Sequence, residues 1–340
     1  MPTPQPQAAS AYPRTTTYLD LIRKNKRESA LLIALMVTLT GVIGATAGAV
    51  VAAYGGVDAV SLVPSAIIGF VAAVLFALLA SLWSWHGGSW AVLRWSGARE
   101  ITKADDPQLF NVVDEMRLAA GLPMPRVFLV DDEALNAFAT GRDPEHAAVA
   151  ITKGLRRKLP RDELQAVMAH EMAHVRHYDI RFSMLMATMV GLIVFFADVM
   201  LNVVFRGGLR SAGRRSRGSS RSGGGGGAVI LVVMAVALLL AVLSPFLATV
   251  IQMAYSRQRE YLADAGAVEL TRNPAALARA LQRLAADPEP LVDAANRSTA
   301  HMFVVNPLRK SKQFRGRRSS IFSSHPPIQD RVARIMALLR

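Results

Sequence analysis

The stretch LQAVMAHEMAHVRHYD, from Leu164 to Asp179, places three of the chain's seven histidines within eight positions. Pro160 and Asp162 stand where a helix start is expected, so we predict a helix that continues through the stretch. On such a helix His170 and His174 are separated by about 40° around the axis and about 6 Å along it. Both imidazoles can therefore reach one ion.

The pattern H-E-x-x-H, here His170 to His174, is typical of zinc peptidases. Two histidines bind the metal, and the glutamate, Glu171, is the base that activates a water molecule. The alternative is a solvated helix face on which histidines fall by chance. His177 falls off the ligand face, so it and Asp179 are expected to have a supporting role at most.

A catalytic zinc ion needs a third protein ligand from elsewhere in the chain. The sequence has no cysteine, so that ligand must be His, Asp, Glu or a backbone oxygen. The stretch SRQREYLADAGA offers Glu260 as a ligand and Asp264, one helical turn later, as a hydrogen-bond acceptor for a ligating histidine. Taken alone, a glutamate and an aspartate at this spacing usually lie on a solvated face.

The composition favours a membrane protein, because 52% of the 340 residues are hydrophobic and the mean hydropathy is +0.28. Residues 29–57 carry no charge and are long enough to cross a bilayer, and a second uncharged run follows Asp58. All four tryptophans lie where this second segment would leave the bilayer, as in an aromatic interface belt. A buried helical pair of a soluble protein is the alternative.

Basic residues flank the first two apolar segments, which predicts that both flanks are cytoplasmic. The formal net charge of +14 arises largely from clusters beside apolar segments or in a loop. Anionic lipid headgroups account for such clusters, so we expect no nucleic-acid partner.

Two further apolar blocks follow the histidine cluster. The first has only 16 residues from Phe182 before Asp198, which is marginal for a span, and the second has 29 uncharged residues from Ala228. Between them, residues 206–227 form a glycine-rich linker with six arginines. If both blocks cross, the arginines lie outside, against the usual charge bias; a hairpin that does not cross would keep them inside.

From about Ser96 the composition is that of a soluble α/β module. Residues 107–123 have helical periodicity with Asp106 as a candidate cap, and residues 126–132 and 146–155 are typical of strands. The stretch NAFATG, residues 136–141, lies between them as a short third strand. The predicted fold is α+β, mainly helical, with transmembrane helices.

Four stretches together resemble the HtpX family of membrane-integral zinc metalloproteases: HEMAH, SRQREYLADAGA, AHMFVVNPL and FSSHPPIQDRVARI. The resemblance implies a zincin-like catalytic domain of the gluzincin type, with one Zn²⁺ per subunit bound by His170, His174 and Glu260, and Glu171 as the base. It further implies a multi-pass protein of a bacterial-type plasma membrane, with the active site facing the cytoplasm. Such a protein cuts misfolded or damaged membrane proteins, as part of a stress response. The arginine linker departs from the family pattern.

The resemblance gives two further stretches a role. NAFATG resembles the family's exposed sheet edge, on which an extended substrate pairs as an added strand; its residues are Asn136, Ala137, Phe138 and Ala139. His325 and Arg331 resemble a pair that related proteases place near the metal, where His325 stabilises the oxyanion. An ordinary connecting strand and a histidine at a helix start are the respective alternatives.

The expected organisation has five parts. They are a basic tail (1–28), an N-terminal transmembrane pair (29–95), a first catalytic part (96–180), a second hydrophobic pair with its linker (181–257) and a second catalytic part (258–340). Two other functions remain open: a membrane scaffold with a structural zinc site, and a processing peptidase for lipid-modified substrates. The sequence leaves the oligomeric state and the natural substrates undetermined.

Overall fold

The structure is a computed structural model that describes residues 18–54, 59–215, 226–286 and 326–338. Three of the features discussed above lie outside the described residues: His325, the stretch 300–308, and the linker beyond Arg215. The chain divides into two compact units. We call residues 1–29, 85–184 and 253–340 the sheet unit, and residues 30–84 and 185–252 the apolar unit.

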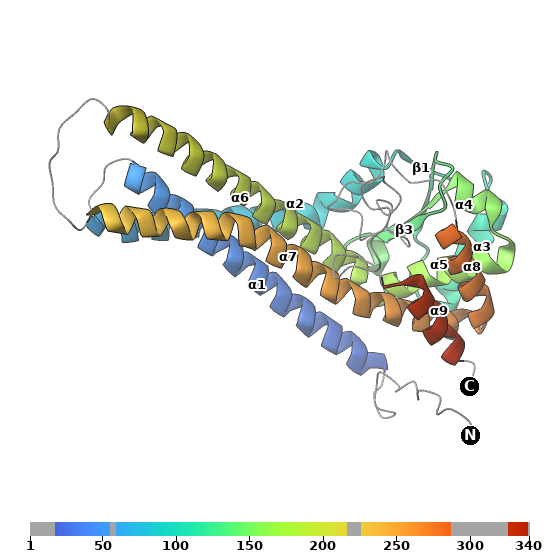
Figure 1. The fold of residues 1–340 in the computed structure, drawn as a ribbon. Helices are drawn as coiled ribbons and strands as arrows, with labels where there is room; N and C mark the ends of the chain where they lie inside the picture. The colour runs from blue at the N-terminus through green and yellow to red at the C-terminus, as the bar shows by residue number, and fades with distance from the viewer. Residues whose placement is uncertain (1–17, 55–58, 216–225, 287–325, 339–340) are drawn as a thin grey trace, which may run out of the picture. The chain divides into compact units, whose positions relative to one another are not determined.

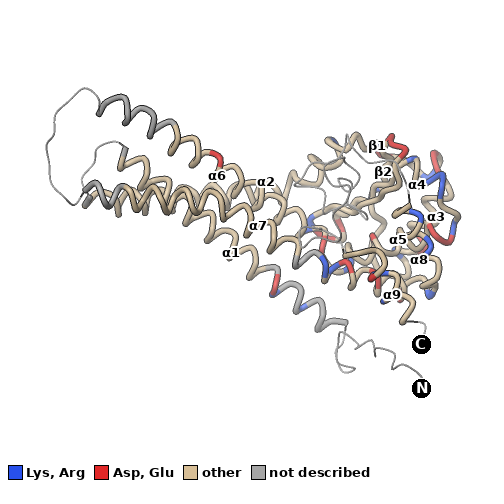
Figure 2. Tube along the Cα trace, in the orientation of Figure 1, with Lys and Arg blue, Asp and Glu red and all other residues tan. Residues whose placement is uncertain are grey.

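Four long helices supply the apolar unit: α1 (Tyr18–Tyr54), α2 (Leu62–Trp95), α6 (Asp179–Arg215) and α7 (Gly226–Thr271) (Figure 1). Each contains a stretch long and apolar enough to cross a membrane, with mean hydropathies of 2.2, 2.6, 2.3 and 2.7. The third block, marginal in the sequence, continues as a helix past Asp198 to give an apolar stretch that ends at Phe205. Figure 2 shows how few charges the middle parts of these helices carry.

Small residues bring α1 and α2 into backbone contact. A Cβ atom on Gly48 would overlap the carbonyl oxygen of Ser65, and one on Gly69 would overlap that of Gly44. Helices in lipid associate by such close packing, because lipid tails are as apolar as the side chains. On α6, the Thr188 hydroxyl donates a 2.8 Å hydrogen bond to Ser84 of α2.

The sheet has four strands in the order β1-β2-β4-β3: β1 (Ala98–Glu100), β2 (Arg126–Val130), β3 (Ala137–Thr140) and β4 (Ala148–Thr152). The parallel pair β2 and β4 forms its centre, and β1 and β3 add antiparallel strands on either side. Strand β3 is therefore an edge strand, paired with β4 on one side only. A 3₁₀ turn, η2 (Pro144–His146), connects β3 to β4.

Five helices complete the sheet unit: α3 (Pro107–Ala120), α4 (Lys153–Lys158), α5 (Arg161–Arg176), α8 (Pro274–Ala286) and α9 (Ile328–Ala337). Helix α3 begins as expected, because the Asp106 carboxylate accepts a 3.0 Å hydrogen bond from the Leu109 N–H. Helix α5 is almost wholly buried and packs against α3, α8 and β3. Its apolar side chains form the centre of the core.

The histidine helix ends earlier than its sequence predicts. We expected it to reach Asp179, but α5 ends at Arg176, and Tyr178 adopts a left-handed backbone conformation with φ of 63°. This conformation disfavours any residue other than glycine and breaks the helix. Asp179 then starts α6, so the histidine helix leads into an apolar helix through a turn of two residues.

Candidate metal centre

Three potential ligands converge in the interior of the sheet unit. His170 and His174 project from successive turns of α5, and Glu260 projects from α7. The Nε2 atoms of the histidines are 3.2 Å apart, and the Glu260 carboxylate lies 3.6 Å from that of His174 and 3.8 Å from that of His170. One ligand atom from each residue lies within 4.8 Å of the others.

These distances fit a tetrahedral metal ion. Zinc bonds to imidazole nitrogen and carboxylate oxygen are about 2.0 to 2.2 Å long, so two ligand atoms of a tetrahedral site are about 3.3 to 3.6 Å apart. The two histidines and the glutamate match this spacing closely. Three protein ligands also leave a fourth position open, as catalysis requires.

A carboxylate contacts the other ring nitrogen of each histidine. Asp264 lies 3.1 Å from Nδ1 of His170, and Asp179 lies 3.0 Å from Nδ1 of His174. A proton on each Nδ1 is thereby favoured, so Nε2 is the ring nitrogen with which each histidine would bind a metal ion. Both carboxylates are buried.

Two buried arginines in turn hold these carboxylates. Arg331 of α9 donates to Asp264 at 2.8 and 2.7 Å and approaches Glu260 at 3.0 Å. Arg259, the residue before Glu260, lies 2.9 Å from Asp179. Burial lowers the pKa of Arg331, but the Asp264 and Glu260 carboxylates outweigh burial and raise it.

Glu171 is also buried, at 2% exposure, on the same helix as the two histidines. Burial raises the pKa of its carboxyl group to about 7, although the charge of His174 and a hydrogen bond from the Ala139 backbone act in the other direction. The hydrogen bond comes from strand β3, so the sheet edge and the carboxylate are in direct contact. A carboxylate with a pKa near neutrality can accept and return a proton.

The two candidate ligands on α5 differ in their protonation. Burial lowers the pKa of His170, which is therefore neutral and ready to bind a cation. For His174, the carboxylates of Asp179 and Glu260 outweigh burial and raise the pKa to about 10 in the metal-free chain. His177, on the next turn, is buried 4.0 Å from Asp179 and is not among the three candidate ligands; burial lowers its pKa to about 4.

Strand β3 presents two different faces. Ala137 and Ala139 pack in the core that contains α5, whereas Phe138 packs on the other side with Phe128 and Ala150. Asn136 is buried, and its side-chain oxygen accepts a 3.0 Å hydrogen bond from the Ala137 N–H. The small side chains therefore lie on the face towards Glu171.

For Asp179 the sequence predicted a supporting role at most, and for Arg259 it predicted none. Asp179 follows His174 by five residues, which on an uninterrupted helix would turn it about 140° away. The helix break at Tyr178 returns the Asp179 carboxylate to the side of His174. Its position directly after a histidine-rich helix and before an apolar segment was the available signal.

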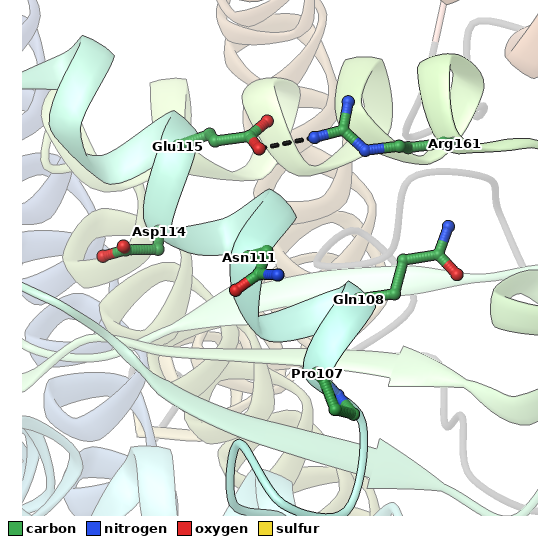
Figure 3. Close-up of a pocket in the computed structure, with 6 residues that line it drawn as sticks. All are labelled: Pro107, Gln108, Asn111, Asp114, Glu115 and Arg161. Atoms are coloured by element: carbon green, nitrogen blue, oxygen red, sulfur yellow. Dashed lines mark hydrogen bonds and ion pairs between the residues drawn. The ribbon is translucent and has the colours of Figure 1, made fainter.

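A separate hollow of about 440 Å³ lies on the outer surface of α3 and α5 (Figure 3). Its lining is polar, and Glu115 and Arg161 point towards each other across it at 2.5 Å. The metal ligands and Glu171 do not contribute to it. Its lining residues are Pro107, Gln108, Asn111, Asp114, Glu115 and Arg161.

Comparison with known proteins places the chain in a family. Residues 103–339 match the model of peptidase family M48. The chain is similar to the protease HtpX homologue of Lactiplantibacillus plantarum, at 42% identity over 93% of this chain and 98% of the relative. It is also similar to the homologues of Dictyoglomus turgidum, at 40% identity over 79% and 81%, and of Listeria monocytogenes, at 39% over 93% and 98%. The crystal structure of S. mikatae Ste24p aligns with 77% of this chain and 57% of its own at 19% identity, with a TM-score of 0.45.

Proposed function

Because this chain is a membrane metalloprotease that belongs to peptidase family M48, we propose that it is a zinc endopeptidase whose ligands are His170, His174 and Glu260. The single observation that carries the proposal is the spacing of these three ligand atoms, which matches a tetrahedral zinc site, beside a buried glutamate. When bound, Zn²⁺ supplies a Lewis acid that polarises the scissile carbonyl and makes water more acidic.

Glu171 is the proposed general base. Its carboxylate takes a proton from the water that attacks the carbonyl carbon and passes it to the nitrogen of the leaving amine. One water is consumed, the C–N bond breaks, and a carboxylate and an amine are formed. The pKa of about 7 supports both halves of this transfer, and the Ala139 N–H holds the carboxylate in place.

Asp179 and Asp264 are the proposed positioning residues for the two histidines. Each contacts the Nδ1 atom of one histidine and is held by a buried arginine. This fixes the tautomer in which Nε2 can bind the metal. Arg331 also restrains Glu260, so one guanidinium positions a ligand and a supporting carboxylate together.

The substrate is proposed to pair, as an extended strand, with the side of β3 that carries no other strand. The small side chains of Ala137 and Ala139 permit a close approach, and the contact between Ala139 and Glu171 brings the strand to the reacting groups. His325 is proposed to stabilise the oxyanion, from the family resemblance alone.

Membrane proteins are the proposed substrates, with quality control of misfolded or damaged chains as the role. The ligands support this, because they are continuous in the chain with apolar helices: α5 leads into α6 within two residues, and Glu260 lies on α7. The basic residues that flank the first two apolar segments favour a multi-pass plasma-membrane protein whose active site faces the cytoplasm.

Replacing the base tests the catalytic assignment. We expect Glu171→Gln to keep one zinc ion per chain and to lose peptide hydrolysis by at least about a thousandfold, since only proton transfer is removed. Metal content is measured by atomic emission and activity with a fluorescent peptide or by autolysis. Full activity with retained zinc would overturn the role of Glu171.

The same variant identifies substrates. Membrane proteins that accumulate with Glu171→Gln in cells, and not with a Glu171→Gln chain that also lacks His170, are captured through the intact metal site. Misfolded membrane proteins in this set support quality control. A set made only of lipid-modified chains would favour the processing peptidase instead.

A further inference from the structure

A polar cluster away from the metal ligands brings together three segments of the sheet unit. They are the last part of α2, the turn that follows β3, and the first turn of α6. We call its four residues, His86, Arg142, His146 and Arg181, the interfacial cluster. Arg142 donates to Nδ1 of His86 at 3.4 Å and to Nε2 of His146 at 2.6 Å.

Arg181 lies beside this pair. Its guanidinium stacks 3.7 Å from the ring of Trp85, the neighbour of His86, so adjacent residues of α2 hold the two arginines. Within the described part of the chain, Arg181 makes no ion pair with a carboxylate and no hydrogen bond. Its N–H groups remain available to a ligand.

The nearby Asp143 is already engaged. Its carboxylate accepts hydrogen bonds from the backbone N–H of His146 at 2.9 Å and from the His146 ring at 2.6 Å. Nδ1 of His146 therefore carries the proton, and Nε2 accepts from Arg142. Asp143 also forms a 3.4 Å ion pair with Nε of Arg142. The cluster nevertheless holds two guanidinium groups and only this one carboxylate, so an excess of positive charge remains.

The backbone fixes Arg142 in position. Gly141, which precedes it, has a φ of 144°, and a Cβ atom there would lie 2.6 Å from the carbonyl oxygen of His146. Only glycine tolerates this combination, so the turn is tight. The turn continues β3 directly.

The position of the cluster along the chain corresponds to a membrane interface. Trp85 and His86 stand in the last third of the candidate span Leu62–Trp95 of α2, after its most apolar part, and Arg181 stands directly before the apolar run of α6 that begins at Phe182. Indole rings at such positions lie at the level of the lipid headgroups. Two guanidinium groups at this depth would lie at the level of the lipid phosphate groups.

We propose that the interfacial cluster binds the phosphate of an anionic phospholipid headgroup, with Arg142 and Arg181 as the donors. Planar guanidinium groups bind phosphate oxygens through paired N–H bonds, and the weakly hydrated Arg181 is already stacked on an aromatic ring. A bound lipid would hold the turn after β3, and hence the proposed substrate strand, at the membrane surface. The lipid site itself requires only that the chain is membrane-integral.

Lipid retention by the full chain tests the proposal. The delipidated protein in detergent is titrated with phosphatidylglycerol or phosphatidylcholine, and retained lipids are counted by native mass spectrometry. Each arginine near anionic lipid contributes about fivefold to binding. We therefore expect Arg142→Gln with Arg181→Gln to weaken phosphatidylglycerol retention about 25-fold, and phosphatidylcholine to bind poorly to both proteins.

Arg94→Gln is the matched control. Arg94 lies near the end of the same helix, is exposed, and also stacks on a tryptophan, 5.1 Å from the ring of Trp90, but it lies outside the cluster. We expect its loss to change lipid retention by less than twofold. Arg181→Gln alone, which removes no hydrogen bond of the described chain, should weaken retention about fivefold if the double variant is unstable.

Three results would overturn the proposal. Unchanged retention in the folded double variant would show that the cluster does not bind lipid. An equal loss of phosphatidylglycerol retention with Arg94→Gln would show that basic residues in general attract the anionic lipid and that the cluster is not a specific site. Displacement of phosphatidylglycerol by millimolar inorganic phosphate would identify a free phosphate as the ligand. Zinc content and melting temperature, measured in parallel, confirm that each variant is folded.

Discussion

At the scale of single residues, the proposed metal ligands are supported by carboxylates outside the proposed ligand set. Asp179 is held between His174 and Arg259, and it is almost fully buried. Its loss removes the hydrogen bond to His174 and the ion pair with Arg259.

We expect Asp179→Asn to weaken zinc binding by about 10- to 100-fold, because supporting hydrogen bonds to a ligating histidine contribute about that much. Competition with a chromophoric chelator measures the affinity. Asp162→Asn is the control, since Asp162 lies on the same helix α5 and pairs with Arg279 at the surface, 44% exposed. Equal affinity in the two variants would contradict the role of Asp179.

Zinc binding should also release a proton from His174. The pKa of this histidine is about 10 without metal, so it is charged at pH 8 and must become neutral to bind. Binding therefore expels about one proton, and affinity rises about tenfold per pH unit up to about pH 10. Calorimetry in two buffers with different ionisation enthalpies measures the release.

The direction of this pH dependence follows from the raised pKa of His174. A raised pKa favours the charged form, so the proton stabilises the metal-free chain at low pH and competes with zinc there. In Asp179→Asn one carboxylate that raises the pKa of His174 is gone, so proton release should decrease. A binding heat that is the same in both buffers would rule out a charged His174.

At the scale of helices and strands, much of the arrangement follows from sequence patterns. Local rules predict features that lie within one segment. These are the spacing of His170 and His174, the helix cap at Asp106 and the four apolar stretches. The order of the strands does not follow in this way, because the edge position of β3 is set by the parallel pairing of β2 and β4.

The contact of Asp179 with His174 was not predicted, for a similar reason. Its carboxylate reaches His174 only because Tyr178 takes a left-handed conformation, and no glycine marks that break in the sequence. The contact of Arg331 with Asp264 depends on how α9 packs, which no local pattern encodes. Family resemblance predicted that Arg331 is near the metal, but not which carboxylates it pairs with.

The packing of α1 on α2 gives a prediction at this scale. Gly48→Leu places a side chain where the Ser65 carbonyl lies, so the helices must separate, at a cost of about 1 to 3 kcal/mol in the free energy of unfolding. Thermal unfolding in detergent measures the loss. Gly191→Leu on α6 is the control, because nothing lies within 4 Å of a Cβ atom at that position. Equal stability of the two variants would mean that α1 and α2 do not pack closely.

At the scale of the whole molecule, the path of the chain between the metal ligands defines the topology. His174 lies before the apolar part of α6, and Glu260 lies after the apolar part of α7. The two residues can meet only if the chain returns to the side of the membrane on which α6 begins. Two crossings satisfy this, and so does a hairpin that does not cross. The linker between the two helices lies on opposite sides of the membrane in the two cases.

Labelling of a single cysteine distinguishes them. The chain has no cysteine, so Ser219→Cys provides one unique thiol in the linker. We expect a membrane-impermeant maleimide to label it in intact cells, because a 29-residue uncharged block is costly to leave in water. Glu145→Cys, in the turn after β3, reports the side of the sheet unit, which we expect to be the inside. Labelling of position 219 only after lysis would show that the pair forms a hairpin.

The separation of the ligands along the chain has a consequence for biosynthesis. His170 and His174 emerge from the ribosome before α6, whereas Glu260 emerges only after the apolar stretch of α7, and Arg331 follows near the end of the chain. A nascent chain with the two histidines alone has an incomplete ligand set. On the proposed ligand set, the metal site is therefore complete only after the apolar stretch of α7 has been synthesised.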